Sequence, residues 1–418
     1  MNHITFAFKN IMGKKKGHLQ EKWKFETNSP LLSSPVIGDI DNDGKMEIIF
    51  GTKDGKILSI DMDGSLKWSY AVQGNYTEME LMFLDAETSN SINSSPNIED
   101  INNDGKKEIV FGTEDGTLYV LDSTGKIFWS FKTQGPIRGS ALVQKFANNQ
   151  CGIIFGSTDK NIYFLNAEGK LLWKYACSSP IESCPHLVLG AKPLIIFGTN
   201  NGEVHALDLR GNLIWTYNAE KKILAQALSR KVGNRMLIFI GSTSGDLHCI
   251  DEQGSPVWKF CTGGAICSKV ALADLNNDGV DEIVFGSCDN NVYALDINGK
   301  ELWSYETDFW VVANPIIADL DGDGKLEIIV GSYDHNIYIL DCEGSYVLDY
   351  VPGVSGIVAQ TGHYGDAVTK GPGKTKGQRI WQYQTEGNIV GCAYMDSEKN
   401  IIINTESGKI KNLMHKQE

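Results

Sequence analysis

A Trp-x-aromatic tripeptide recurs along this chain of 418 residues and limits its fold more than any other feature. Eight of the nine tryptophans belong to it: Trp23, Trp68, Trp129, Trp173, Trp215, Trp258, Trp303 and Trp381. Five of the seven intervals between them are 42 to 45 residues long, and the other two are 61 and 78 residues. A fixed period of this length is typical of repeat architectures, so the long intervals indicate insertions into a repeated unit.

Each repeated unit contains four short apolar segments, as residues 33–70 illustrate. Asp54-Gly55 and Asp63-Gly64 separate the later segments, and such dipeptides are typical of tight β-hairpins. The unit therefore predicts a four-stranded antiparallel meander. Because so small a sheet cannot bury both faces alone, the units must stack on one another, as propeller blades do. Eight inner strands can be counted, so the sequence predicts an all-β, eight-bladed β-propeller of four-stranded antiparallel blades.

The first and last elements are expected to close the ring. The last unit ends near residues 411–413 without a tryptophan of its own, whereas Trp23-Lys-Phe25 precedes the first unit. An N-terminal strand that completes the eighth blade leaves no exposed sheet edge. We therefore expect an N-terminal tail at 1–20 and one propeller at 21–414, with insertions at about 73–90 and 346–378. The repeated tryptophans are interpreted as packing between blades.

Four units carry a nine-residue acidic loop between their first and second strands. At positions 1, 3, 5, 7 and 9, these loops supply Asp39, Asp41, Asp43, Lys45 and Glu47; Asp100, Asn102, Asp104, Lys106 and Glu108; Asp274, Asn276, Asp278, Val280 and Glu282; and Asp319, Asp321, Asp323, Lys325 and Glu327. Side-chain oxygens at positions 1, 3, 5 and 9, a main-chain carbonyl at position 7 and a glycine at position 6 suit Ca²⁺. We predict up to four bound Ca²⁺ ions. The alternative is an ordinary turn whose side chains cap their own backbone.

Two patterns resemble known repeat families. Residues 112–129 and 286–303 are similar to the pyrroloquinoline-quinone-type (PQQ-like) propeller repeat. The acidic loops resemble the FG-GAP repeats of integrin-α-like propellers, although position 9 holds Glu where those repeats usually have Asp. The resemblance spans about residues 20–414 and implies a propeller, a fold that serves enzymes, adhesion modules and scaffolds alike. The sequence lacks a vicinal cysteine pair and recurrent axial aromatic residues, so we expect no PQQ cofactor.

Two columns of residues on the inner strands are expected to line the axial channel. With the units aligned, the first column is Leu32, Asn93, Arg138, Glu182, Leu224, Cys267, Val312 and Val390. The second column is Ser34, Ser95, Ser140, Cys184, Gln226, Lys269, Asn314 and Cys392. Both are too varied for a uniform packing role, which instead suits the aliphatic column Leu31, Ile92, Ile137, Ile181, Ile223, Ile266, Val311 and Ile389.

Several polar and aromatic residues are candidates for contact with a small ligand. They are Arg138, Glu182, His186, Gln226, Lys269 and Asn314 in the channel, together with Trp310 and His363. In the alternative interpretation, Arg138 and Glu182 pair with each other in a water-filled channel, and Trp310 covers that channel. Residues 345–350 could also form an outer strand with Leu348 in the place of the tryptophan, which would move the second insertion to the opposite face. We expect the functional surface to span units 7, 8, 1 and 2, which carry both insertions.

Composition excludes other functions. The chain has 52 acidic and 38 basic residues, a formal charge of −14, and so lacks the positive field that nucleic acids require. No apolar stretch is long enough to predict a membrane span, and the N-terminal residues do not resemble a secretory signal. Nine scattered cysteines without a CxxC motif are interpreted as reduced thiols. We expect a cytoplasmic location and leave an extracytoplasmic one open.

Two classes of function are compatible with these patterns. The first is a non-catalytic, calcium-binding scaffold that binds a protein or a small ligand. The second is a calcium-dependent enzyme, a lyase, hydrolase or cyclase, with its site at the mouth of the axial channel. The sequence contains no HExxH or GxSxG motif, and this favours the first class.

Overall fold

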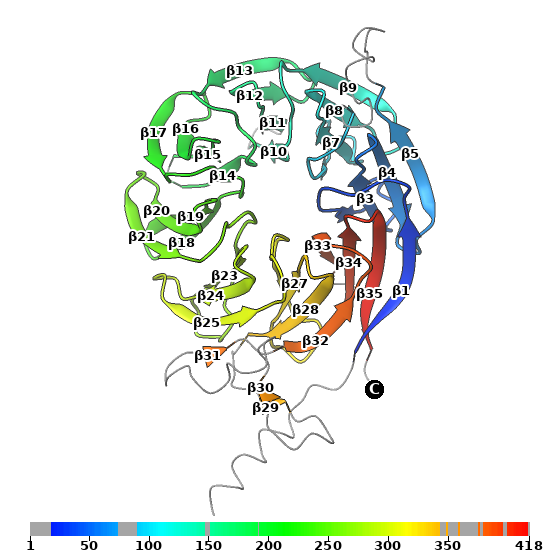
Figure 1. Ribbon diagram of the computed structural model, residues 1–418. Coiled ribbons are helices and arrows are strands. Elements are labelled where there is room, and N and C mark those ends of the chain that lie inside the picture. The colour runs from blue at the N-terminus through cyan, green and yellow to red at the C-terminus, as the bar shows by residue number, and fades with distance from the viewer. Residues whose placement is uncertain are drawn as a thin grey trace, which may run out of the picture.

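Short β-strands separated by tight turns run through the whole described part of the chain (Figure 1). The computed structural model describes residues 18–73, 90–146, 151–190, 192–342, 379–395 and 399–416, and the strand segments 348–349, 358–359 and 375–376. These residues form eight blades of antiparallel strands arranged in a ring and one further two-stranded sheet, and no helix occurs among them. The predicted eight-bladed, all-β propeller is therefore confirmed.

Each blade uses four strands in the order inner to outer. The first four blades are β2 (Val36–Gly38), β3 (Glu47–Gly51), β4 (Lys56–Asp61) and β5 (Leu66–Ala71); β6 (Asn97–Glu99), β7 (Glu108–Gly112), β8 (Thr117–Leu121) and β9 (Ile127–Lys132); β10 (Leu142–Lys145), β11 (Cys151–Gly156), β12 (Asn161–Asn166) and β13 (Leu171–Ala176); and β14 (His186–Val188), β15 (Leu194–Gly198), β16 (Glu203–Leu207) and β17 (Leu213–Asn218). The next three are β18 (Leu228–Val232), β19 (Arg235–Gly241), β20 (Asp246–Asp251) and β21 (Pro256–Cys261); β22 (Ala271–Ala273), β23 (Glu282–Gly286), β24 (Asn291–Leu295) and β25 (Glu301–Glu306); and β26 (Ile316–Ala318), β27 (Glu327–Gly331), β28 (Asn336–Asp341) and β32 (Arg379–Gln384).

The eighth blade joins the two ends of the chain. It consists of β33 (Ile389–Met395), β34 (Asn400–Thr405), β35 (Lys409–Lys416) and, as the outer strand, β1 (His18–Glu26). β1 pairs with β35 in antiparallel register, with Trp23 opposite Asn412. The ring is therefore closed by the N-terminal strand, as the sequence predicted.

The second strands of the blades are buried on both faces, which explains their continuous apolar sequences. The five residues of β3 are all buried, and the same holds for β7, β15, β23 and β27. Neighbouring blades cover both faces of these strands, so alternation of apolar and polar residues is lost. One phenylalanine of this strand has no exposed surface in six blades: Phe50, Phe111, Phe155, Phe197, Phe239 and Phe285.

The repeated tryptophans connect each blade to the next. Seven indole N–H groups donate to a main-chain carbonyl in the following blade, at 2.7 to 3.1 Å; the pairs are Trp23–Met62, Trp68–Ser123, Trp129–Ala167, Trp173–Leu209, Trp215–Glu252, Trp258–Ile297 and Trp303–Cys342. Six of the rings also lie against a turn glycine of that blade, for example Trp173 against Gly211. The tryptophans therefore fill the space between blades, as interpreted from the sequence.

The two insertions fall mostly outside the described residues. The first joins β5 to β6, and residues 74–89 are not described. The second joins β28 to β32, so β32, which contains Trp381, is the outer strand of blade 7. Leu348 lies in β29 (Leu348–Asp349), which pairs with β30 (Val358–Ala359), and β31 (Thr375–Lys376) adds to the edge of β25. The alternative with Leu348 in the place of the tryptophan is therefore wrong.

Candidate functional site

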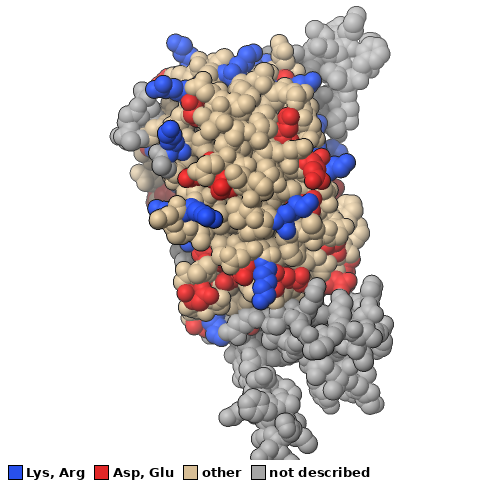
Figure 2. All heavy atoms as spheres, turned by 90° about the vertical axis from the view of Figure 1, so that its left-hand side faces the viewer, with Lys and Arg blue, Asp and Glu red and all other residues tan. Residues whose placement is uncertain are grey.

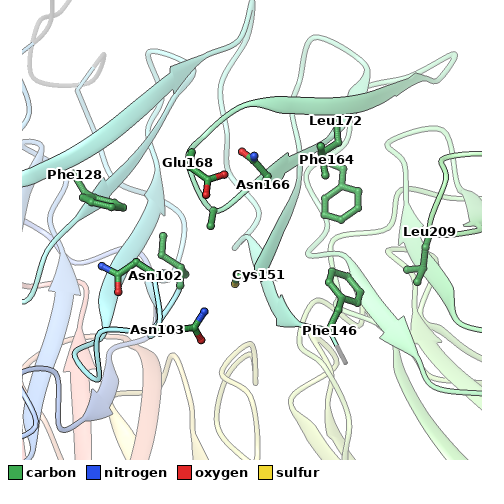
Figure 3. A pocket seen from close by; sticks show the side chains of 12 residues that line it. Asn102, Asn103, Phe128, Phe146, Cys151, Phe164, Asn166, Glu168, Leu172 and Leu209 are labelled. Atoms are coloured by element: carbon green, nitrogen blue, oxygen red, sulfur yellow. The ribbon is translucent and has the colours of Figure 1, made fainter. Parts of the chain in front are cut away.

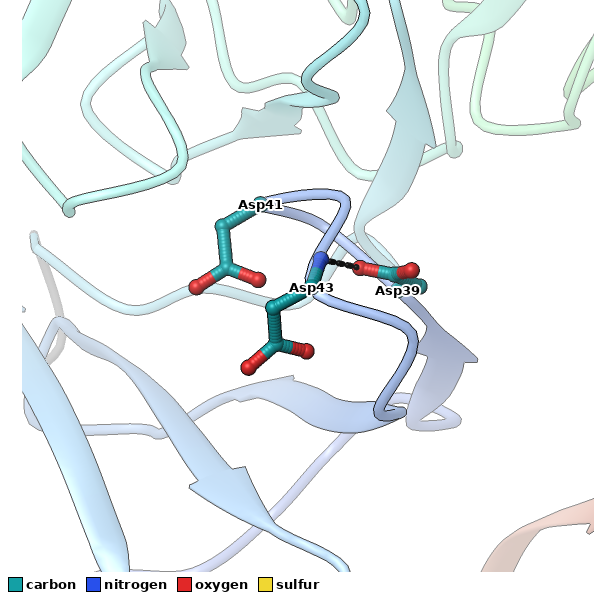
Figure 4. Close-up of side chains that lie close together, drawn as sticks. All are labelled: Asp39, Asp41 and Asp43. Atoms are coloured by element: carbon teal, nitrogen blue, oxygen red, sulfur yellow. Dashed lines mark hydrogen bonds between the residues drawn. The ribbon is translucent and has the colours of Figure 1, made fainter.

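The four acidic loops share one hydrogen-bonded conformation. In blade 1, the Asp39 carboxylate accepts hydrogen bonds from the amides of Asp43 (3.2 Å) and Gly44 (2.9 Å), and Figure 4 shows the first of these. The loops of blades 2 and 6 repeat this pair of bonds, and in blade 7 Asp319 accepts from Gly322 and Gly324. In all four, the aspartate at position 5 accepts from the amide of position 7 at 2.8 or 2.9 Å. Asn42 and Gly44 both have positive φ, which the sharp turn requires.

The glutamate at position 9 is buried beneath each loop. Glu47, Glu108, Glu282 and Glu327 are at most 3% exposed. One carboxylate oxygen of each accepts a hydrogen bond from the amide of position 2, at 2.7 to 3.0 Å. A carboxylate this buried needs a partner for its second oxygen. That second oxygen faces into the loop, toward the side chain at position 3.

The partner of that second oxygen differs between loops. In blades 2 and 6, it accepts from the side-chain amides of Asn102 (3.1 Å) and Asn276 (3.0 Å). Burial raises the pKa of Glu108 to about 7, and the charges of neighbouring aspartates add to this shift. The pKa of Glu282 is raised for the same reasons.

In blade 1, a lysine takes the corresponding place. Lys67 Nζ lies 2.6 Å from Glu47 Oε1 and 2.8 Å from Asp41 Oδ2. Burial alone would lower the pKa of Lys67, but these two hydrogen bonds raise it above its usual value. The other oxygen of Asp41, Oδ1, is buried without a hydrogen-bond partner. The loop thus holds a cation of its own and one unsatisfied oxygen.

Two loops bring three carboxylates within reach of a single ion. Asp39, Asp41 and Asp43 place one oxygen each within 4.8 Å of one another, and so do Asp319, Asp321 and Glu327. Figure 4 shows that Asp41 and Asp43 lie side by side on the turn. Oxygen donors at this spacing are the ligands that Ca²⁺ prefers. The loops of blades 2 and 6 have asparagine at position 3 and so offer an amide oxygen there instead.

The two varied columns line one axial cavity. All sixteen of their residues border a hollow of about 780 Å³ at the centre of the ring. The aliphatic column next to them has no exposed surface in any blade. The alternation read from the inner strands therefore places these side chains correctly.

Charged residues at one mouth of the cavity form a continuous network across blades 2 to 5. Arg138 pairs with both oxygens of Glu114, at 2.8 and 3.0 Å, and with Glu182 at 3.3 Å. Lys222 Nζ lies 3.0 Å from the other oxygen of Glu182, and Asn200 donates to the same carboxylate. The alternative in which Arg138 and Glu182 pair with each other agrees with this geometry, and Glu114 is a partner that the sequence did not reveal.

The remaining candidate ligand contacts have varied surroundings. Gln226, Lys269 and Asn314 border the cavity, and Asn314 accepts a hydrogen bond from the Lys269 main-chain amide at 3.0 Å. His186 does not border it: its Nε2 lies 2.9 Å from Ser229 Oγ, and burial lowers its pKa to about 4. Trp310 is 44% exposed and stacks on Phe309 at 5.0 Å. His363 lies outside the described residues.

Comparison with known proteins places the chain in a family. Residues 76–180 and 237–350, more than half of the chain, match the model of the lambda-carrageenase beta-propeller domain. The chain belongs to this family. Lambda-carrageenase from Pseudoalteromonas carrageenovora is 27% identical over 124 residues, which are 30% of this chain but 11% of that protein.

A solved structure supports the fold of this carrageenase-type propeller. BamB from Moraxella catarrhalis is similar with a TM-score of 0.62 and 19% identity, and the match covers 95% of this chain and 99% of that one. At this identity the likeness concerns the fold alone. The narrower resemblance to PQQ-like and FG-GAP repeats stays a prediction. Within the described residues, no helix is long and apolar enough to cross a membrane.

This family member also has a rim pocket that the sequence analysis missed. A pocket of about 510 Å³ lies between blades 2 and 3, with Asn102 and Asn103 of the acidic loop on one side and Phe146 and Phe164 on the other (Figure 3). Next to the pocket, the outer strands β9, β13 and β17 each begin with a pair of exposed apolar residues: Ile127 and Phe128, Leu171 and Leu172, and Leu213 and Ile214. From the side of blades 4 and 5, scattered charges separate broad uncharged areas (Figure 2). The signal was an apolar pair before Trp129, Trp173 and Trp215, where an exposed strand predicts polar residues.

Proposed function

We propose that this chain is a calcium-binding β-propeller that binds a protein or a small ligand without catalysing a reaction. The observation that carries the calcium part is the shared conformation of the four acidic loops. In blades 1 and 7, three carboxylates of the loop already bring one oxygen each within 4.8 Å of one another. An ordinary capped turn explains the amide bonds, but it leaves Asp41 Oδ1 without a partner.

The chemistry of the loop residues fits Ca²⁺. Asp319, Asp321 and Glu327 in blade 7 bring three carboxylate oxygens within 4.8 Å of one another. In blades 2 and 6, the amides of Asn102 and Asn276 must rotate so that oxygen, rather than nitrogen, faces the ion. In blade 1, Ca²⁺ must displace the ammonium of Lys67. The bound ion would brace the turn between the first two strands of each of these blades.

The axial cavity supports the binding part of the proposal. Arg138 and Lys222 already pair with carboxylates at its mouth. Lys269 also borders the cavity but is exposed, and among the described residues no carboxylate pairs with its ammonium. We place an anionic group of a small ligand next to Lys269, with Gln226 and Asn314 as neighbouring hydrogen-bonding groups.

Calcium titration by isothermal calorimetry tests this proposal on the full chain after removal of divalent ions. We expect saturable binding, and Asp321→Ala should remove one site. Asp251→Ala changes an acidic hairpin turn outside the four loops and is the matched control. A full-length protein that binds no Ca²⁺ at millimolar concentration would contradict the proposal.

An enzyme remains the second candidate because of the family match to the lambda-carrageenase propeller domain. The chain matches only a small part of the lambda-carrageenase protein, so that activity is a proposal for this chain. The test is to incubate the calcium-loaded chain with lambda-carrageenan and to measure both retention on the polymer and new reducing ends. Release of reducing ends that stops with a chelator would replace the non-catalytic proposal with the enzymatic one.

A further inference from the structure

One backbone hydrogen bond is repeated in every blade at the mouth of the cavity that holds the charged network. In each blade, a residue in the turn after the second strand donates its backbone N–H to a main-chain carbonyl. The residue with this carbonyl lies two positions before the residue that the same blade contributes to the first cavity column. The donors are Lys53, Glu114, Thr158, Asn200, Thr243, Cys288, Tyr333 and Glu406, and the distance is 2.9 Å in all eight blades. This bond fixes the turn residue beside the cavity residue of the same blade.

The side chains at these two positions meet where their chemistry allows it. In blade 2, Asn93 Nδ2 donates to Glu114 Oε1 at 2.6 Å. In blade 4, Asn200 Nδ2 donates to Glu182 Oε1 at 2.8 Å. The pair of positions therefore forms a contact inside one blade, between the inner strand and the turn that precedes the third strand.

In blade 6, both positions hold cysteine. Cys267 borders the axial cavity, Cys288 lies in the turn between β23 and β24, and both side chains are partly exposed. The thiols of Cys267 and Cys288 lie close enough together that each shifts the pKa of the other. Cys267 borders the cavity and Cys288 does not, so Cys267 is the thiol that an oxidant in the cavity reaches first.

We propose that Cys267 and Cys288 are a modification site that forms a disulfide within blade 6. Three observations support it: the repeated backbone bond, the side-chain contacts at the same positions in blades 2 and 4, and the contact between the two thiols. The sequence could not reveal this pair, because 20 residues and two complete strands separate the two cysteines.

The reaction needs a small-molecule disulfide as the oxidant. The Cys267 thiolate attacks one sulfur, forms a mixed disulfide and releases one small-molecule thiolate, which takes up a proton from solvent. The Cys288 thiol then loses its proton and attacks the Cys267 sulfur, which releases the second small-molecule thiol. The two cysteines lose two electrons and two protons in total, and the oxidant becomes two thiols.

Oxidised glutathione is a suitable probe on the folded full chain. After incubation and blocking of remaining thiols, trypsin cleavage at Lys269 separates the two cysteines into peptides 260–269 and 270–300. We expect these peptides to be linked in a non-reduced digest, to separate on reduction, and two free thiols to be lost per chain. Cys261 shares the first peptide but lies exposed on the outer strand, so Cys261→Ser is the matched control and should keep the link.

Variants of the pair supply a second measurement. Cys288→Ser should keep glutathione attached to Cys267, since the resolving thiol is gone, and Cys267→Ser should abolish the link. If the wild-type chain gains stable glutathione at either cysteine without any link between the two peptides, the proposal is wrong. If a variant fails to fold, the peptide map of the wild-type chain alone decides whether the disulfide forms.

Discussion

Lys67 gives the acidic loop of blade 1 a cation that contacts two of its candidate calcium ligands. Its ammonium joins Asp41 and Glu47, whereas the residue before the tryptophan is Phe128 in blade 2 and Leu302 in blade 6. Two carboxylates in contact with a lysine are already compensated, so Ca²⁺ gains less by binding there. The loop of blade 1 should therefore bind Ca²⁺ more weakly than it would without Lys67.

Replacement of Lys67 tests this difference. In Lys67→Met, the carboxylates of Asp41 and Glu47 lose their internal cation, so calcium affinity of this loop should rise at least tenfold, which corresponds to about 1.4 kcal/mol. Without Ca²⁺ the same variant should melt at a lower temperature than the wild type, because Oε1 of its buried Glu47 loses the Lys67 partner. Calorimetry and thermal melting measure the two effects.

Lys132→Met is the control, since Lys132 pairs with Asp115 outside the acidic loops. Its calcium titration should match that of the wild type. If Lys67→Met leaves every calcium affinity unchanged, the ammonium does not compete with the ion.

Adjacent blades are connected by the contact between a tryptophan and a turn glycine. Trp173 on β13 donates to Leu209 O at 3.0 Å, and its ring covers Gly211 in the turn before β17. A Cβ atom at Gly211 would lie 2.8 Å from the ring, and the residue has φ +82°. Glycine is therefore required here for two reasons: the positive φ of the backbone and the close approach of the Trp173 ring.

Gly211→Ala should destabilise the protein by more than its backbone cost alone. The left-handed conformation costs an alanine about 1–2 kcal/mol, and the clash with Trp173 adds to this. Gly233→Ala isolates the backbone cost, because Gly233 also has positive φ but a Cβ atom added there would meet no other atom within 4 Å. Urea unfolding of both variants measures the difference, and equal losses in the two would refute a role for the ring contact.

On the scale of the whole molecule, local sequence patterns predicted the architecture but not the contacts between distant residues. The tryptophan period gave the number of blades, and alternation on the inner strands gave the residues of the cavity. The sequence did not identify the roles of Glu114, Lys67 and Cys288, because each of them meets its partner only after turns and strands have packed. The rim pocket was missed for the same reason, since residues of blades 2, 3 and 4 build it together.

The four acidic loops extend this account to the stability of the ring. Three of them lie on blades 7, 1 and 2 and one on blade 6, around blade 8, where the two ends of the chain meet. An ion that binds only the folded state stabilises it by about 2.7 kcal/mol per site at a hundredfold excess over its Kd. Calcium should therefore strengthen the half of the ring that contains the closure.

Thermal melting of the full chain with excess chelator and with millimolar CaCl₂ tests the central claim most directly. We expect a higher melting temperature with calcium, and a smaller gain in Asp321→Ala, which weakens the loop of blade 7. Magnesium at the same concentration should give a smaller increase, since it accepts fewer protein oxygens. Coincident melting curves with chelator and with calcium would contradict the assignment of these loops as calcium sites.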